Sequence, residues 1–380
     1  MLSIGWRNLK RDRLRLCVAV LGVIFAVVLV TVELGMLLGL VRNASMLIDD
    51  SRADLWVSTV DVKTFDFANP VEQRKRYLIE GVAGVERVEE FNASFSSWKL
   101  PSGGNMNVQV IGFDVRGQLA PPLELSAGRI EDLHNRDAVI VDESELSKLG
   151  HPKIGDLVEI IGQRAEVVGY TRGMRSFTTA PFIFTSLRRG EQYGYLTSIG
   201  WQSRRPAVYF LVKVGAGYDV ETVRRSIEAH VSNVEAHTRA GFSMRTRKYW
   251  LLETGVGLGF LGASILGLLV GGVILSQSLY AMTLEKLPEY GVLRAIGASM
   301  RDLGRVVVEQ ALICGVLGLA IGIVISAGLQ AAANSAGTAV LLPWQLVGAV
   351  AFVTTVMCML AALASIHRLR RLEPAMVFRT

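Results

Sequence analysis

The most regular feature of the chain is the alternation between four long apolar runs and one long stretch of mixed character. The apolar runs cover residues 16–41, 253–284, 305–332 and 343–366. Each is long enough to cross a bilayer as a helix. The fold class that follows is a membrane protein with four transmembrane α-helices and one large domain, residues 42–252, inserted between the first and second helix.

The inserted stretch mixes the two hydrophobic periods that distinguish strands from helices. A Pro101-Ser-Gly-Gly104 turn separates two of the expected strands, and Asp219 has the position and chemistry of a helix N-cap. The expected strands are Ala53–Val60, Val88–Leu100, Asn107–Phe113, Leu157–Ile161, Ala165–Tyr170 and Val208–Val214, and the expected helices are Pro70–Glu80 and the one that Asp219 caps. This order predicts an α+β domain with neighbouring ends and an insertion around residues 114–200.

Small residues recur at every fourth position along the second apolar run. They are Gly255, Gly259, Ala263, Gly267 and Gly271. Such a register forms a groove along one helix face and allows another backbone to approach closely. We expect tight helix packing along this stripe, either within the chain or between two copies of it. A similar register, Gly318, Gly322 and Ser326, follows in the third run.

A short charged segment, residues 285–304, joins the second and third runs. Pro288 suits the first turn of a helix, and Gly297 suits the left-handed position after its end. Ser299 and Asp302 then have the spacing of a capping pair for the next helix. The pattern predicts a short helix held between two membrane spans, and an ordinary charged turn is the alternative.

The distribution of basic residues orients the spans. The formal net charge is +6, and segments 1–15, 285–305 and 367–380 hold 5, 4 and 4 Lys and Arg, whereas the turn 333–342 holds none. By the positive-inside rule, both termini and the charged loop are cytoplasmic and the inserted domain is outside. Glu33 interrupts the first span, either as a functional acid or as a carboxylate that reaches interfacial water.

The chain offers little chemistry of its own. It has no Gly-x-x-x-x-Gly-Lys-Ser/Thr loop for nucleotide phosphates, and its histidines have no usual zinc spacing. The inserted domain holds 27 Lys and Arg against 26 Asp and Glu, which argues against a nucleic-acid partner. His230 and His237 are expected to be solvated surface residues. We therefore expect no enzyme, no cofactor and no metal in this chain.

Arginines and aromatic residues are dense toward the end of the inserted domain. Either a partner protein or lipid headgroups would suit this mixture, and a solvated surface is the simpler interpretation. They are Arg172, Arg175, Arg188, Arg189, Arg204 and Arg205 with Phe177, Phe182, Phe184 and Trp201.

Several short sequences resemble the permeases of the MacB/FtsX class of ABC transporters. They are Trp6-Arg-Asn-Leu9 in the basic tail, Glu289-Tyr-Gly-Val-Leu-Arg-Ala-Ile-Gly-Ala298 in the loop, and Arg371-Leu-Glu-Pro374 at the end. The four-span layout with one large inserted domain is similar as well. Lys286-Leu-Pro-Glu-Tyr-Gly291 departs from the usual Arg-x-x-Glu-Ile-Gly form and, with Ser51–Trp56, is closer to the DevC-like subgroup associated with glycolipid export.

The resemblance implies a homodimer in the bacterial inner membrane, with two separate ABC ATPase subunits that bind ATP and Mg beneath it. A periplasmic membrane-fusion adaptor and an outer-membrane exit duct are the further partners it implies. The expected work is mechanical transmission from the ATPases to the outer domain. Since the loop is short and capped and the chain has no nucleotide site, we expect the ATPase to bind Glu289, Tyr290, Leu293 and Arg294.

Two other functions share this topology. One is an FtsX-like regulator that activates a cell-wall hydrolase, although such chains have a much smaller outer domain. The other is a lipoprotein-releasing permease, which normally works as a heterodimer. Neighbouring genes for an adaptor, a hydrolase or a lipoprotein carrier would distinguish the three, and the sequence does not identify the cargo.

Overall fold

The computed structural model describes residues 13–176, 180–194, 206–286, 289, 292, 299–335 and 338–370. Its contacts divide the chain into two units. One unit combines Met1–Leu38 with Gly257–Thr380, and the other is Gly39–Val256, which we call the inserted domain.

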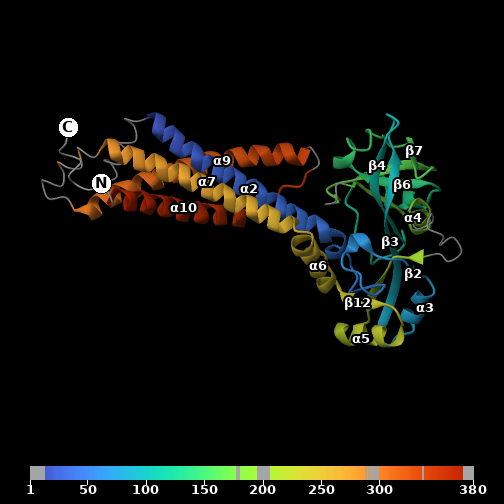
Figure 1. Ribbon diagram of the computed structural model, residues 1–380. Helices are drawn as coiled ribbons and strands as arrows, with labels where there is room; N and C mark the ends of the chain where they lie inside the picture. The colour runs from blue at the N-terminus through green and yellow to red at the C-terminus, as the bar shows by residue number, and fades with distance from the viewer. Residues whose placement is uncertain are drawn as a thin grey trace. The chain divides into compact units, whose positions relative to one another are not determined.

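The first unit is built from helices long and apolar enough to cross a membrane, and four are found among the described residues. They lie side by side in Figure 1. Their bounds are α2 (Arg13–Asp49), α7 (Val256–Glu285), α9 (Met300–Ser335) and α10 (Trp344–Arg370). The prediction of four spans with an α+β domain between the first and second is confirmed.

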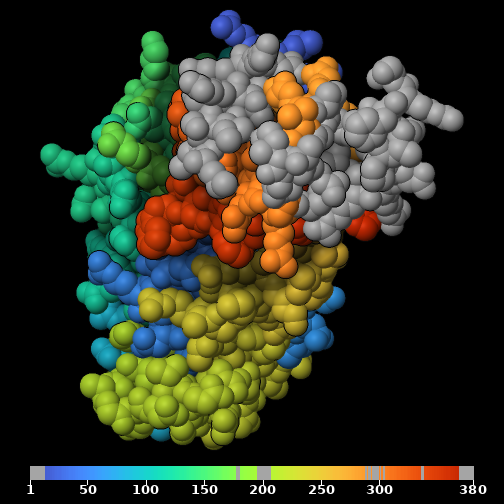
Figure 2. All heavy atoms as spheres, turned by 90° about the vertical axis from the view of Figure 1, so that its left-hand side faces the viewer, coloured from blue at the N-terminus to red at the C-terminus, as the bar shows by residue number. Residues whose placement is uncertain are grey.

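Glycines bring α9 close to α2. A Cβ added to Gly318 would lie 2.5 Å from a Val23 methyl carbon, and one added to Gly322 would lie 2.7 Å from a Val27 methyl carbon. The small-residue register in the third run therefore packs against the first helix of the same chain. Viewed from the end of the helices, orange atoms of α9 lie against red atoms of α10 (Figure 2).

The inserted domain is organised around a ten-stranded mixed sheet. The long strand β3 runs through the whole domain (Figure 1) and pairs with β11, β4 and β7. The order along the sheet is β12-β1-β11-β3-β4-β9-β6-β8-β5, with β7 beside β3 and β8. The strands are β1 (Leu55–Ser58), β3 (Val85–Lys99), β4 (Asn105–Phe113), β5 (Leu125–Ala127), β6 (Ala138–Asp142), β7 (Leu157–Ile160), β8 (Gln163–Thr171), β9 (Phe182–Ser186), β11 (Tyr209–Val214) and β12 (Glu235–Thr238).

Short helices and a second, two-stranded sheet complete the domain. The sheet pairs β2 (Val71–Glu72) with β10 (Pro206–Ala207). The α-helices are α3 (Lys75–Glu80), α4 (Leu187–Tyr193), α5 (Val220–His230) and α6 (Arg239–Lys248), and the single turns are η1 (Phe65–Phe67), η2 (Ile130–His134), η3 (Glu143–Glu145) and the π-helical η5 (Tyr249–Glu253).

Strand β1 shows how the predicted alternation is used. Trp56 points into a central aromatic cluster, whereas Leu55 and Val57 point into a second core beneath α3 and α5. All four residues of β1 are buried, because each face of the strand meets a different core. Since β12 and β11 flank β1, the two ends of the domain are neighbours, as predicted.

One prediction for this domain needs correction. The helix expected from Pro70 begins only at Lys75, because Val71 and Glu72 are extended and pair with β10. The stretch expected as an insertion, residues 114–200, adds β5 to β9 to the main sheet, with β9 parallel to β4. The predicted cap of α5 is present, since the Asp219 carboxylate accepts the Thr222 N–H at 2.9 Å.

Candidate functional site

Of the charged loop between α7 and α9, the structure describes Lys286, Glu289, Val292 and Ser299. The Lys286 ammonium group lies 3.0 Å from the Glu289 carboxylate. Ser299 caps α9 as predicted, because its N–H donates to the Asp302 carboxylate at 3.0 Å and its hydroxyl accepts the Asp302 N–H at 3.3 Å. Of the predicted ATPase-binding residues, Tyr290, Leu293 and Arg294 lie outside the described residues.

The glycine stripe divides into two halves. A Cβ added to Gly267 would lie 2.6 Å from Leu29, and one added to Gly271 would lie 2.6 Å from the Ala26 Cβ. This half of the stripe packs on α2 within the chain. Gly259 has no heavy atom within 4 Å of an added Cβ among the described residues, and Ala263 is half-buried.

Gly255, the first predicted member of the stripe, lies outside the helix. Its φ of +75° places it in the left-handed region between η5 and α7. Glycine adopts this conformation without the steric cost of a Cβ. The residue interrupts the helical path before α7, so it does not share the helix face of the other predicted members of the stripe.

We call the place where α2 and α6 meet the root of the inserted domain. An arginine of α6 connects the two helices there. Arg247 of α6 donates from Nε to the Ser45 hydroxyl at 2.7 Å and from Nη2 to the Asp49 carboxylate at 2.6 Å. Ser45 and Asp49 are one turn apart on α2, so a single guanidinium contacts two successive turns. The helix α2 extends past the predicted span to Asp49, and its last turns carry this contact.

A buried carboxylate ties η5 to the rest of the domain. The Trp250 indole N–H donates to Asp66 and Thr64, both at 3.1 Å, and the Thr64 hydroxyl lies 3.4 Å from Asp66. Burial raises the pKa of Asp66 to about 6, and the hydrogen bonds from Trp250, Gln109 and Thr64 oppose that rise. The buried environment of Asp66 therefore disfavours the ionised carboxylate relative to the protonated acid.

The histidines of the inserted domain lie in different surroundings. His230 contacts the Ser226 carbonyl oxygen at 2.7 Å, and no group of three or more potential ligands is found among the described residues. His237 is not the solvated residue that we expected, because its side chain is 12% exposed and its ring stacks on Phe242 at 5.3 Å. Burial lowers its pKa, which favours the neutral ring.

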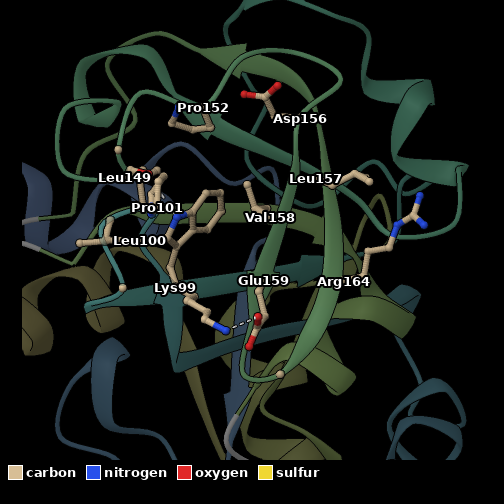
Figure 3. Close-up of a pocket in the computed structure, with 14 residues that line it drawn as sticks. Lys99, Leu100, Pro101, Leu149, Pro152, Asp156, Leu157, Val158, Glu159 and Arg164 are labelled. Atoms are coloured by element: carbon tan, nitrogen blue, oxygen red, sulfur yellow. Dashed lines mark hydrogen bonds and ion pairs between the residues drawn. The ribbon is translucent and has the colours of Figure 1, made fainter.

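A hollow of about 750 Å³ lies beside the β3–β4 turn. Figure 3 shows Pro101 and Leu149 on one side of it and the β7–β8 hairpin on the other, with Lys99 paired to Glu159 at 2.8 Å. Trp98 is fully buried, and its indole N–H donates to the Leu149 carbonyl at 3.2 Å. The sequence indicated the turn but not this hollow, because β7 comes from a distant part of the chain.

Two protein families match the chain in succession. The family described as MacB-like periplasmic core domain matches residues 16–230, and FtsX-like permease C-terminal matches residues 261–374. An uncharacterized ABC transporter permease of Methanocaldococcus jannaschii is 24% identical over 201 residues. That match covers 50% of this chain and 48% of the relative, so the chain spans about half the relative's length.

Two solved structures are weakly similar to about half of the chain. The extracellular domain of the noncanonic ABC-type transporter YknZ from Gram-positive bacteria has a TM-score of 0.34 at 12% identity, covering 49% of this chain and 99% of that one. The periplasmic region of MacB from Actinobacillus actinomycetemcomitans has a TM-score of 0.37 at 11% identity, covering 52% and 94%.

Proposed function

The chain belongs to the family of ABC transporter permeases that combine a MacB-like periplasmic core domain with an FtsX-like C-terminal region, and on that premise we propose that it transmits ATP-driven movement to its inserted domain. The ATP and Mg would be bound by two separate ATPase subunits beneath a homodimer of this chain. Both termini and the charged loop would be cytoplasmic, and the inserted domain would lie outside the bacterial inner membrane.

The observation that carries this proposal is the way the two spans enter the inserted domain. Helix α2 is uninterrupted from Arg13 to Asp49, so it has no break between the span and the domain. The second connection is different, because η5 and Gly255 interrupt the helical path before α7. The continuous helix α2 would act as a stiff connection, and the interrupted segment before α7 would act as a flexible one. With one connection of each kind, a displacement of the spans would rotate the domain as well as translate it.

The root contacts would make this transmission effective. Arg247 joins α6 to the last turns of α2, and Trp250 joins η5 to the buried Asp66. The first contact joins the two ends of the domain to each other, and the second joins its C-terminal end to a buried carboxylate. A force applied at either connection would therefore reach the sheet through hydrogen-bonded side chains as well as through the backbone.

On the cytoplasmic side, the ATPase would bind the loop helix through Glu289, Tyr290, Leu293 and Arg294. The capping of α9 by Ser299 supports this role, because it fixes where the loop ends and the third span begins. The half of the glycine stripe around Gly259 would pack against the second copy, because Gly259 has no close neighbour among the described residues of this chain.

We propose export of a lipid, a glycolipid or another hydrophobic cargo, as in the DevC-like subgroup, with a membrane-fusion adaptor and an exit duct. The adaptor would bind the inserted domain, where the hollow beside Pro101 offers a concave surface with exposed Leu157 at its edge. Such a surface suits a protein segment better than a flat sheet face would.

The test is co-purification of the full-length chain under mild detergent, with every bound chain identified. We expect an ABC ATPase and an adaptor with the wild type. Leu293→Asp should abolish ATPase binding while leaving membrane insertion intact, because a charge placed in a buried apolar contact costs at least a few kcal/mol. The matched control is Leu78→Asp on α3, where the side chain is 55% exposed and the ATPase should be retained.

Normal ATPase binding by Leu293→Asp would refute the loop as the docking site. A cell-wall hydrolase in place of an adaptor would indicate the FtsX-like regulator. A second, different permease chain with a lipoprotein carrier would indicate lipoprotein release instead.

A further inference from the structure

A second pocket of the inserted domain, about 470 Å³ in volume, is lined by charged and amide side chains among the described residues. They come from the turn before β6, the start of β8 and helix α4, and they are Arg136, Asp137, Gln163, Arg164 and Arg189. Its volume lies within the range of pockets that hold small ligands.

Arg189 is fixed in place at one side of this pocket. Its side chain is 15% exposed, forms an ion pair with the Asp137 carboxylate and also donates to the Gln192 side chain. Asp137 has a φ of +73°, a left-handed conformation that aspartate tolerates better than most residues. The guanidinium is therefore held by side chains rather than free in solvent.

The backbone carbonyl groups of Asp137 and Arg164 are also held by hydrogen bonds. The Tyr193 hydroxyl donates to the Arg164 carbonyl oxygen at 2.8 Å, and the Glu166 N–H donates to the Asp137 carbonyl oxygen at 2.8 Å. Burial raises the pKa of Tyr193 to about 12, so it remains a hydroxyl donor at neutral pH. These bonds fix the positions from which the side chains of residues 137 and 164 extend.

The charges of the pocket are not balanced. Arg136 and Arg164 are exposed, and neither has a carboxylate partner within ion-pair distance in the described part of the chain. Figure 3 shows Arg164 of β8 extending away from Glu159 of the neighbouring strand β7, which is paired with Lys99 of β3. Three guanidinium groups against one carboxylate leave the pocket with a net charge of about +2.

We propose that this pocket binds a dianionic phosphate group, as found in inorganic phosphate and in phosphate monoesters. Such a group carries about −1.5 to −2 charges at neutral pH, which complements the pocket, whereas a carboxylate carries only one. Guanidinium groups match phosphate oxygens with paired N–H donors, which a lysine cannot reproduce. The group has two sources, a free phosphate or the headgroup of a lipid with a terminal phosphate.

Titration calorimetry on the full-length chain in detergent tests the proposal with two probes, inorganic phosphate and dioctanoyl phosphatidic acid. Dioctanoyl phosphatidylcholine, which has no phosphate monoester, serves as the negative probe. Binding of inorganic phosphate identifies the free anion as sufficient, and binding of phosphatidic acid alone identifies the lipid headgroup.

Arg164→Gln should weaken binding of the active probe about tenfold or more, as expected for the loss of a charge-assisted hydrogen bond. Arg116→Gln, which removes an exposed arginine that does not line the pocket, should leave the affinity unchanged. The proposal is overturned if neither probe binds, if Arg164→Gln binds like the wild type, or if both variants lose affinity equally.

Discussion

Replacing Asp66 by asparagine should make the inserted domain more stable at neutral pH. The asparagine side chain would keep an oxygen that accepts the Trp250 N–H, which Asp66 now accepts at 3.1 Å. Its new amide donor would face Gln109, whose Nε2 lies 3.5 Å from Asp66. The Gln109 Oε1 atom is buried without a hydrogen bond in the described part of the chain, so rotating its amide would give both groups a partner.

The magnitude follows from the pKa of Asp66, which burial raises from 3.8 to about 6. Because the folded state holds the proton more tightly than the unfolded state, ionisation above pH 6 opposes folding. A rise of about two in the pKa corresponds to about 3 kcal/mol. This penalty is absent below pH 3.8, grows as the pH rises to about 6, and is complete at pH 7.5.

The measurement is urea unfolding of the full-length chain in detergent at pH 7.5 and pH 4. Asp66→Asn should raise the free energy of unfolding by up to about 3 kcal/mol at pH 7.5 and by almost nothing at pH 4. Asp114→Asn, at an exposed position, should change it by less than about 0.5 kcal/mol at either pH. A destabilised Asp66→Asn variant at pH 7.5, or a gain of equal size at both values, would refute the reasoning.

Three further predictions concern the spans and the root. Gly271→Leu should destabilise the isolated chain and Gly259→Leu should not, because an added Cβ would meet Ala26 only at position 271. Thermal unfolding in detergent tests this, and an equal loss of stability in both variants would contradict it. A cysteine at Ser102 should react with an impermeant reagent in intact cells and one at Ser299 should not; labelling of position 299 would reverse the topology. Arg247→Ala should lower the free energy of unfolding by about 1 kcal/mol, and an unchanged urea midpoint would show that the root contact is not stabilising.

The topology test uses Ser102 rather than its neighbour Gly103 for a structural reason. Gly103 has a φ of +90°, so a cysteine there would strain the β3–β4 turn. Ser102 is exposed in the same turn without that restriction. The sequence predicted the turn and its strands correctly, and the backbone conformation decides which position can be replaced.

Much of the fold was predictable because it depends on local pattern. The four apolar runs, the β3–β4 hairpin and the Asp219 cap each involve residues close in sequence, where hydrophobic period and capping chemistry are decisive. The start of α3 was predicted wrongly for the opposite reason. The extended conformation of Val71 is stabilised by pairing with Ala207, which lies far along the chain.

The glycine stripe illustrates what periodicity alone leaves out. The spacing marks positions of small residues, but the reason for the small residue differs between them. Glycine at position 255 permits a left-handed backbone conformation, whereas glycine at position 271 permits the close approach of α2. A regular register in sequence can therefore combine two physical causes. Only the φ angle and the neighbouring helix distinguish them.

The root contacts could not be predicted, because they join residues about two hundred positions apart. Nothing near Arg247 identifies Ser45 and Asp49 as its partners, and nothing near Trp250 identifies Asp66. These pairs hold both connections of the inserted domain in place. Both α2 and the segment before α7 are bonded to the inserted domain, and only the second contains a residue in the left-handed region, Gly255. If the spans transmit movement as we propose, a displacement of one connection would be opposed by the other unless the backbone at Gly255 changes conformation. The position of that glycine is therefore where a mechanical role would require freedom of movement.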